Sequence, residues 1–239
     1  MNSDSFINIK INSKNIDIYT VRISILKTLR SKLHVFSNRM LDIGCGKMPY
    51  RKLILDESKV TEYVGLDIEN ALEYDGLIKP DFIWDGNRMP FDDNSFDCAI
   101  GTEVLEHCPN PEKIMKEVHR ILKNDGVFFF TVPFLWNLHE VPNDEYRYTP
   151  FSLERHLKAS GFNRIEISAM GGWHASLAQM IGLWVRRSPI GSFKRELLSV
   201  LFKQVIKKLI KMDLRHKVEF TEGQMITGLY GTAYKYIAQ

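Results

Sequence analysis

The sequence predicts an α/β fold built on a parallel sheet that binds a ligand at the ends of its strands. In residues 39–50, RMLDIGCGKMPY, an apolar run from Met40 to Ile43 ends in a turn with two glycines. Pro49 follows, and proline suits the first turn of a helix because its missing N–H is not needed there. Further apolar segments of strand length alternate with helical patterns along the chain. Strand, loop and helix units of this kind often bind nucleotides.

The turn at Gly44 and Gly46 distinguishes between two classes of nucleotide ligand. Glycine has no Cβ and tolerates positive φ, so the N–H groups of this turn can approach a ligand closely. A dinucleotide site has glycine at the sixth position of its motif, where this chain has Pro49. Asp42 would repel a pyrophosphate but suits a ligand with a cationic amino-acid part. S-adenosylmethionine fits that description, and an ordinary strand-to-helix turn is the alternative.

Length and composition indicate one cytoplasmic domain with an appendage. The chain has 239 residues, of which 44% are apolar and 26% charged, enough for one sizeable core. Its three cysteines, Cys45, Cys98 and Cys108, form no C-x-x-C pair, so we expect neither disulfides nor a thiolate zinc site. The N-terminus lacks the apolar core of a signal peptide, and no run reaches the roughly 18 apolar residues of a membrane span.

One helix is expected before the glycine turn and one directly after it. Residues 1–38 form a leader, in which apolar residues recur at three- to four-residue spacing between positions 17 and 37. This period predicts an amphipathic helix that packs over the ligand mouth or across the sheet. Residues 50–57 fit a second, short helix directly after the turn.

A second buried strand, residues 61–68, ends in an acid at Asp67. Asp67 lies 23 residues after Gly44, close to the spacing of the ribose-binding acid in a βαβ unit. A carboxylate at this strand end could accept hydrogen bonds from both ribose hydroxyls. The alternative is a strand-end acid that only caps the next turn.

Four further elements are expected between residues 82 and 132. They are strand 3 at residues 82–84, strand 4 at residues 96–101, a helix at residues 110–124 and strand 5 at residues 127–132. Asn110 is a suitable N-cap and Pro111 a suitable first helical residue, and Asn124-Asp125-Gly126 is expected to end the helix. The last strand is an unbroken apolar run, as a central parallel strand requires. Residues 92–94 are polar and aperiodic, so they form a loop.

The joint order of these motifs resembles a known family. LDIGCG, GLDI, MPFDDNSFD, EVLEH and EVHRILKNDGVFFFTVP are similar to the class I S-adenosylmethionine-dependent methyltransferases, of the methyltransferase-11 type, over about residues 39–134 and 145–170. The resemblance implies a methyltransferase domain at residues 39–239. Its sheet would be Rossmann-like and seven-stranded, of order 3-2-1-4-5-7-6, with strand 7 antiparallel and helices on both faces. It also implies S-adenosylmethionine as cofactor and S-adenosylhomocysteine as product.

The resemblance also implies which residues hold the cofactor. The turn would line the methionine portion, Asp67 would bind the ribose hydroxyls, and Ile68 would cover one adenine face. Asp85 and Gly86 would lie at the adenine edge, and Glu103 just past strand 4. The cofactor-binding residues expected are Asp42, Gly44, Cys45, Gly46, Asp67, Ile68, Asp85, Gly86 and Glu103. Lys47 and Met48 depart from the family, since many members have a further small residue there.

Glu103, Glu106 and His107 follow strand 4 and raise the question of a metal. Some quinone-pathway members of the family place a divalent cation on a Glu-x-x-Glu-His at this position, and carboxylates with an imidazole can hold one. Leu-Glu-His also occurs in relatives without a metal, where it shapes the pocket. We predict no metal here, and a divalent cation is the alternative.

Residues 136–162 carry the second cluster of ionisable side chains. A long loop rich in such side chains at the end of strand 5 is typical of a functional site, and Thr149-Pro150 then begins a helix that Gly161 ends. His139 is our candidate general base, because a histidine pKa near neutrality suits the removal of a hydroxyl proton, and His107 is the second candidate. Arg147 is expected to tie the loop to Asp144 or another acid rather than to clamp substrate.

The pattern around His139 resembles family members that modify bacterial sugars and surface glycans. It implies O-methylation of a sugar or glycan precursor. N-methylation of an amino sugar or other small amine is one alternative, and a non-catalytic module that binds the cofactor is another. A nucleic-acid substrate is disfavoured, because Gly101 to Glu103 do not form the Asn-Pro-Pro-aromatic motif of such enzymes.

A basic helical insert, residues 173–217, separates strand 6 (162–170) from strand 7 (226–237). It has ten Lys and Arg against two acids, a net charge of +8, while the rest of the chain carries −5. Two helices are expected, at 173–187 and 193–212. A helix with an apolar and a basic face can lie in a membrane interface, so a peripheral contact with anionic lipid is one hypothesis. The alternatives are a cap on the substrate pocket and a homodimer contact.

Overall fold

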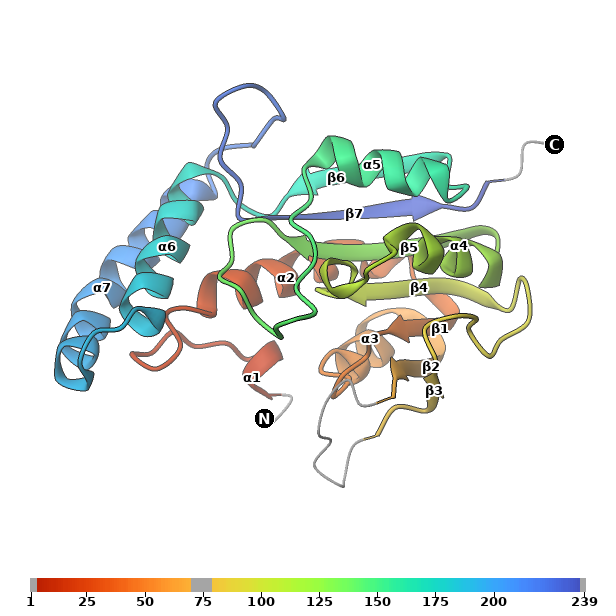
Figure 1. The fold of residues 1–239 in the computed structure, drawn as a ribbon, viewed down its shortest axis with the longest axis horizontal. Helices are drawn as coiled ribbons and strands as arrows, with labels where there is room; N and C mark the ends of the chain where they lie inside the picture. The colour runs from red at the N-terminus through yellow and green to blue at the C-terminus, as the bar shows by residue number, and fades with distance from the viewer. Residues whose placement is uncertain (1–3, 70–78, 237–239) are drawn as a thin grey trace.

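A computed structural model describes residues 4–69 and 79–236. Residues 1–3 of the predicted leader, residues 70–78, and the end of the predicted strand 7 at Ile237 lie outside this range. The seven strands form one sheet in the order β3-β2-β1-β4-β5-β7-β6, and β7 runs antiparallel to both β5 and β6 (Figure 1). The predicted strand order and direction are therefore confirmed. The strands are β1 (Ser37–Ile43), β2 (Lys59–Ile68), β3 (Phe82–Trp84), β4 (Phe96–Thr102), β5 (Leu122–Pro133), β6 (Arg164–Ala169) and β7 (Gly228–Tyr234).

Helices cover both faces of the sheet. α2 and α3 pack on one face, where Ile25 and Leu29 of α2 lie in one core cluster with Met40 and Phe129, and α4 and α5 pack on the other. β5 shows why both faces are apolar, since its consecutive phenylalanines point alternately to the two cores. The helices are α1 (Asp4–Ile7), α2 (Tyr19–Lys32), η1 (Leu33–Val35), α3 (Arg51–Glu57), η2 (Leu105–His107), α4 (Pro111–Ile121), α5 (Pro150–Ala159), α6 (Trp173–Arg187) and α7 (Ser192–Asp213).

Two predicted helix ends are wrong by several residues. α2 ends at Lys32 rather than near residue 37, because the chain passes through a 3-10 turn into β1. α4 ends at Ile121 rather than at Asn124, because Leu122 already pairs with Phe96 of β4. The Asn-Asp-Gly sequence instead forms an irregularity inside β5, where Asp125 has a positive φ of 62°.

The leader lies across the sheet and also meets the insert. α2 crosses one sheet face, while Phe6 at the end of α1 makes an edge-to-face contact with Tyr50, just after the glycine turn. The buried carboxylate of Asp17 forms a salt bridge with Arg187 of α6, with 2.8 Å between Oδ2 and Nε. The leader therefore joins the sheet to the insert.

The insert forms an antiparallel helical hairpin between β6 and β7, as predicted (Figure 1). Its base is closed by Asp213 at the end of α7, whose carboxylate accepts the N–H groups of Gly172 and Ala175 at 3.0 Å each. A carboxylate at the start of α6 also complements the helix dipole. Among the residues described, no helix is long and apolar enough to cross a membrane.

Candidate active site

The turn after β1 and the segment after β4 come into contact at one edge of the sheet. Gly44 has a positive φ of 60°, and a Cβ added to it would lie 2.7 Å from the side chain of Val104. No side chain can therefore replace Gly44 without displacing the segment after β4. β1 lies between β2 and β4, so the carboxyl ends of these three strands meet at this edge.

Asp67 holds the glycine turn in place from the end of β2. Its carboxylate accepts the N–H of Gly46 at 2.9 Å and the N–H of Ile68 at 2.8 Å. Gly46 also has a positive φ, of 49°, which suits glycine. Asp67 is buried, whereas Ile68 is 47% exposed and presents an apolar surface beside it. The acid predicted to bind ribose thus also fixes the turn predicted to bind methionine.

Asp42 is buried beneath this turn and has a perturbed pKa. The phenol of Tyr63 donates a hydrogen bond of 2.5 Å to its carboxylate. Burial, together with the nearby charge of Asp67, raises the pKa of Asp42 to about 7, against the opposing effect of the Tyr63 hydrogen bond. Sequence reasoning missed Tyr63. Tyr63 pairs with Met40 on the adjacent strand β1, and Met40 lies two residues before Asp42, so Tyr63 and Asp42 lie on the same face of the sheet.

The remaining predicted cofactor residues lie around the same edge. Burial raises the pKa of the Cys45 thiol well above its usual range, so this cysteine stays protonated. Trp84 pairs with Ile68, the last residue of β2, so Asp85 and Gly86 lie one and two residues beyond this pair. The Asp85 carboxylate is exposed and accepts two hydrogen bonds from Asn87, at 2.8 Å each, which lower its pKa.

Glu103 directly follows β4 and has an unusual backbone conformation. Its φ is +55°, and its N–H donates to the backbone oxygen of Thr131 at 3.0 Å. Its carboxylate accepts a hydrogen bond from the Thr131 hydroxyl at 2.8 Å. Burial raises the pKa of Glu103 to about 7, since the Thr131 bond and the charge of Arg147 oppose it only in part.

Glu106, His107 and His139 form a cluster beside Glu103. His107 Nε2 lies 3.8 Å from a carboxylate oxygen of Glu106, and the two imidazole rings meet at a centroid distance of 4.7 Å. One potential ligand atom from each residue lies within 4.8 Å of the others, so the three could hold an ion. The sequence motif groups Glu103 with Glu106 and His107. In the structure the third member of the cluster is His139 instead of Glu103, because the Glu103 carboxylate accepts a hydrogen bond from Thr131. That no metal is bound stays a prediction.

The carboxyl group of Glu106 is fully buried, and neither oxygen has a hydrogen-bond partner among the described residues. Burial, and next the charge of Glu103, raise its pKa well above the usual value. A raised carboxyl pKa means that the folded state holds this proton more tightly than the unfolded state. The resulting stability is present below the unfolded pKa of about 4.5 and is lost as pH rises toward the folded value.

Glu106→Gln should therefore make the protein less sensitive to alkali. Between about pH 5 and about pH 8 we expect the free energy of unfolding to fall less in this variant, by on the order of 1 kcal/mol. Urea unfolding at both pH values measures the difference. Glu154→Gln is the control, because Glu154 is an exposed partner of Lys158 on α5. An identical loss of stability in Glu106→Gln and the unaltered protein would contradict this account.

His139 is oriented by an acid that a second residue holds in place. Its Nδ1 lies 3.3 Å from Asp144, and its backbone N–H donates to the same carboxylate at 3.1 Å. Arg147 binds Asp144 through both terminal nitrogens, at 2.6 and 2.8 Å, so the expected loop tie is present. This pairing lowers the pKa of Asp144 far below its usual range, while burial lowers the pKa of His139. His139 is therefore a neutral imidazole near pH 7.

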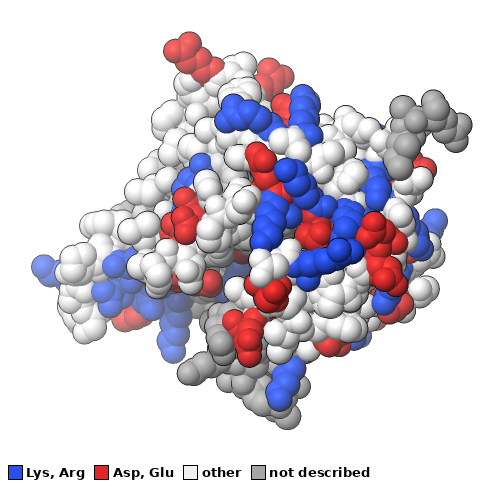
Figure 2. All heavy atoms as spheres, turned by 45° about the vertical axis from the view of Figure 1, so that its right-hand side comes forward, with Lys and Arg blue, Asp and Glu red and all other residues white. Residues whose placement is uncertain are grey.

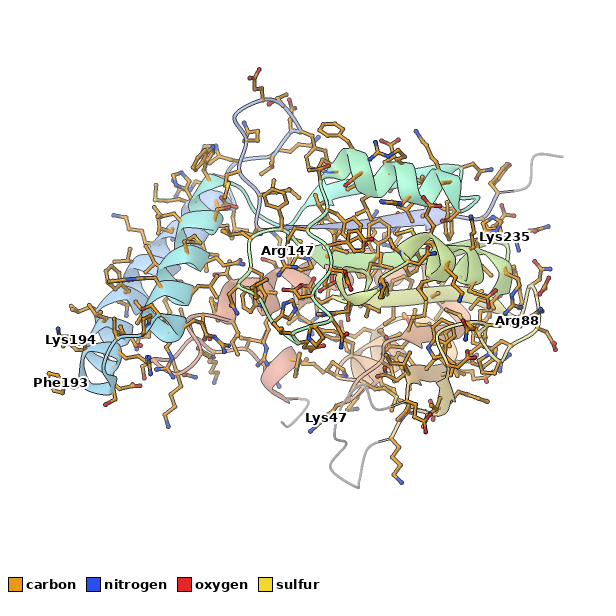
Figure 3. The ribbon with its side chains drawn as sticks, in the orientation of Figure 1. Lys47, Arg88, Arg147, Phe193, Lys194 and Lys235 are labelled. Carbon is orange, nitrogen blue, oxygen red and sulfur yellow. The ribbon has the colours of Figure 1, made fainter. Side chains whose placement is uncertain are left out.

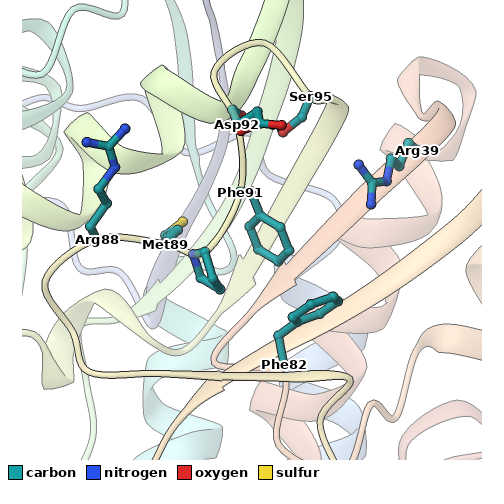
Figure 4. Close-up of a pocket in the computed structure, with 8 residues that line it drawn as sticks. Arg39, Phe82, Arg88, Met89, Phe91, Asp92 and Ser95 are labelled. Atoms are coloured by element: carbon teal, nitrogen blue, oxygen red, sulfur yellow. Dashed lines mark hydrogen bonds between the residues drawn. The ribbon is translucent and has the colours of Figure 1, made fainter.

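A separate cavity of about 540 Å³ lies beside the connection between β3 and β4 (Figure 4). It is lined by Arg39, Phe82, Arg88, Met89, Pro90, Phe91, Asp92 and Ser95. None of the predicted site residues lines it. In Figure 3, Arg88 lies at the opposite end of the molecule from the insert, whereas Arg147 lies in the loop near α6. The cavity is therefore distinct from the site at the carboxyl ends of β1, β2 and β4.

Comparison with known proteins bears on the central part of the chain. Residues 41–130 match the family described as "Methyltransferase domain". An uncharacterized protein of Methanocaldococcus jannaschii is 36% identical over 105 residues, 41% of this chain and 38% of that protein. A sterol 24-C-methyltransferase of Aspergillus fumigatus is 33% identical over 133 residues, 48% of this chain and 33% of the relative. A ubiquinone biosynthesis O-methyltransferase of Paraburkholderia phymatum is 31% identical over 118 residues, 44% of this chain and 49% of the relative.

This chain thus spans less than half the length of each of these relatives. A solved complex between the Haloferax volcanii Trm112 methyltransferase activator and a methyltransferase contains a chain with the same fold. The two chains superpose with a TM-score of 0.57 at 16% identity, and the match covers 90% of each. At that identity the likeness shows the fold alone, and it extends well beyond residues 41–130.

Proposed function

We propose that this chain, which carries a methyltransferase domain at residues 41–130, transfers a methyl group from S-adenosylmethionine to an oxygen of a sugar or surface-glycan precursor. The glycine turn held by Asp67 at the ends of β1 and β2 supports the cofactor part of the proposal, and the candidate base His139 beside Asp144 supports an oxygen acceptor. In open α/β sheets, ligands bind outside the carboxyl ends of the strands at the switch in strand order. The switch here lies at β1 and β4.

The residues at this edge fit the cofactor. Gly44 leaves no side chain between the turn and the segment after β4. Each Asp67 oxygen already accepts a backbone N–H, and a carboxylate oxygen can accept a second hydrogen bond, which two ribose hydroxyls would supply. Ile68 offers an exposed apolar surface for a base. The bound cofactor would supply an electrophilic methyl group on a positively charged sulfur.

Asp42 makes cofactor affinity dependent on pH. Its pKa of about 7 means that it is largely protonated at pH 6 and largely ionised at pH 8. Only the ionised carboxylate attracts a cationic amino-acid group, so affinity should rise between about pH 6 and about pH 8. We expect this rise to be clearly smaller in Asp42→Asn, as measured by isothermal titration with S-adenosylmethionine. Equal slopes for the variant and the unaltered protein would argue against a role for Asp42.

The acceptor would be deprotonated on the other side of the site. An alcohol needs a base as it attacks, and the neutral His139 can take that proton at Nε2 while Nδ1 faces Asp144. Asp144 stabilises the imidazolium that forms, and Arg147 keeps Asp144 ionised and in position. His107, whose Nδ1 contacts the backbone oxygen of Asn143 at 2.9 Å, is the second candidate. Otherwise the protein chiefly holds the reacting atoms in line.

N-methylation of an amino sugar or other small amine is the second candidate function. The observation in its favour is the carboxyl group of Glu106 after β4, which has no hydrogen-bond partner among the described residues and could accept a hydrogen bond from an unprotonated amine. A third possibility of another class is a module that binds the cofactor without reaction.

An acceptor panel separates these functions. S-adenosylhomocysteine release would be measured with nucleotide sugars, free sugars, amino sugars and simple amines, beside titration of the cofactor. Release with hydroxyl acceptors supports our proposal, and release with amines alone would replace it by the second candidate. Binding without release across the panel would indicate a silent module.

A further inference from the structure

We propose that the α6–α7 hairpin docks on an anionic phospholipid bilayer. The structure exposes an unusual amount of apolar surface there. Ten of the eighteen large apolar side chains that are exposed among the described residues lie between positions 173 and 214. Phe193 is the extreme case, with 81% of its surface exposed at the tip of the hairpin (Figure 3). Exposed apolar side chains concentrated on one pair of helices in this way indicate an interaction site rather than ordinary scatter.

The exposed apolar residues form one stripe on each helix. On α6 they recur at three- and four-residue spacing, at Trp173, Leu177, Met180 and Trp184. On α7 they are Phe193, Leu197, Val200, Leu201 and Val205. Trp184 meets Phe202 of α7 edge to face at 6.2 Å, so the first stripe reaches the helix that carries the second. On the opposite faces of the two helices, Ala178 of α6 and Ile206 of α7 form one core cluster with Ile16 of the leader.

The positive charge beside these stripes indicates which kind of partner binds them. The exposed Lys194, Lys207, Lys208 and Lys211 of α7 have no salt bridge among the described residues. In Figure 2, basic side chains follow the lower edge of the lobe at the left, beside uncharged surface. Apolar side chains flanked by lysines suit a lipid bilayer whose interior is apolar and whose head groups are anionic. A second copy would instead bring two segments of charge +8 together.

The hairpin also touches the loop of the candidate active site. Gln179, on the buried face of α6, donates a hydrogen bond to the backbone oxygen of Leu135, where the loop carrying His139 begins. A docked hairpin would therefore hold this loop close to the membrane surface. The docking surface lies outside the cofactor site, so its test does not depend on methyl transfer.

Sedimentation of the 239-residue chain with vesicles tests the proposal. We expect it to bind vesicles of phosphatidylcholine with about 30% phosphatidylglycerol, to bind pure phosphatidylcholine far less, and to be released by high salt. Phe193→Ser/Leu197→Ser should weaken the partition by at least about tenfold. Both side chains are mostly exposed, so their removal leaves the core intact, which circular dichroism would verify. Phe151→Ser is the matched control, since Phe151 is 65% exposed on α5 and outside the hairpin.

Two outcomes would overturn the proposal. One is absence of binding to the anionic vesicles at low salt, and the other is equal binding by Phe193→Ser/Leu197→Ser and the unaltered protein. Light scattering tests the alternative that a second copy of this chain binds the hairpin. A dimer that the double substitution converts to a monomer, without vesicle binding by either form, would assign the hairpin to a second copy.

Discussion

Asp67→Ala should weaken the binding of S-adenosylmethionine by about 100-fold. The substitution removes the carboxylate that would accept the ribose hydroxyls, and two charge-assisted hydrogen bonds together contribute about 3 kcal/mol. It also removes the acceptor for the Gly46 N–H at 2.9 Å, so the glycine turn loses its support. Isothermal titration with the cofactor and with S-adenosylhomocysteine measures both affinities, and both should fall together because both ligands carry the ribose.

Asp97→Ala is the matched control for this variant. Asp97 is also an acid on a parallel strand with several partners, and it accepts from Arg39 N–H at 3.2 Å and Lys123 at 2.9 Å. It lies near the amino end of β4, away from the glycine turn. We expect Asp97→Ala to alter stability but not cofactor affinity. Equal affinity in Asp67→Ala and the unaltered protein would remove Asp67 from the binding site.

His139→Ala should lower turnover by about 100-fold or more and leave cofactor affinity nearly unchanged. The imidazole would take the acceptor proton, and its loss leaves Asp144 and Arg147 paired but without a base beside them. In the unaltered enzyme the acid limb of the pH–rate profile should lie below the ordinary histidine pKa of 6.5, since burial lowers the pKa of His139. Turnover with the best acceptor from the panel, measured over pH, checks both statements.

His156→Ala is the control for the histidine. His156 has a similar partner, Glu112, whose carboxylate lies 3.1 Å from Nδ1, but it lies on α5 outside the cluster. Its substitution should not change turnover. Unchanged turnover in His139→Ala would exclude His139 as the base, and a large loss in His107→Ala alone would transfer the role to His107.

Much of the fold follows from local patterns along the chain. The strands and helices are predictable because apolar periodicity, proline and capping residues act over a few positions. Asn110, for example, accepts the N–H of Lys113 at 3.1 Å as an N-cap, and Thr149 caps α5 in the same way. The prediction of the end of α4 is wrong for the opposite reason. Pairing of Leu122 with Phe96 in the sheet overrides the local Asn-Asp-Gly signal.

The candidate site is harder to predict, because its contacts join distant segments. Asp144 and Arg147 are three residues apart, and their pairing is predictable from spacing. His107 ends η2 and His139 lies in the loop after β5, and nothing in either local pattern predicts that the two rings meet. The same holds for the Thr131 hydroxyl, which withdraws Glu103 from the cluster, and for the Tyr63 phenol on Asp42.

The most direct test of the account is calorimetric titration of the unaltered protein with S-adenosylmethionine and with S-adenosylhomocysteine. Our account predicts saturable binding of each at one site per chain, with competition between the two. An absence of binding heat for both ligands over a range of temperatures, from protein that circular dichroism shows to be folded, would contradict the central claim that the ends of β1 and β2 form a cofactor site.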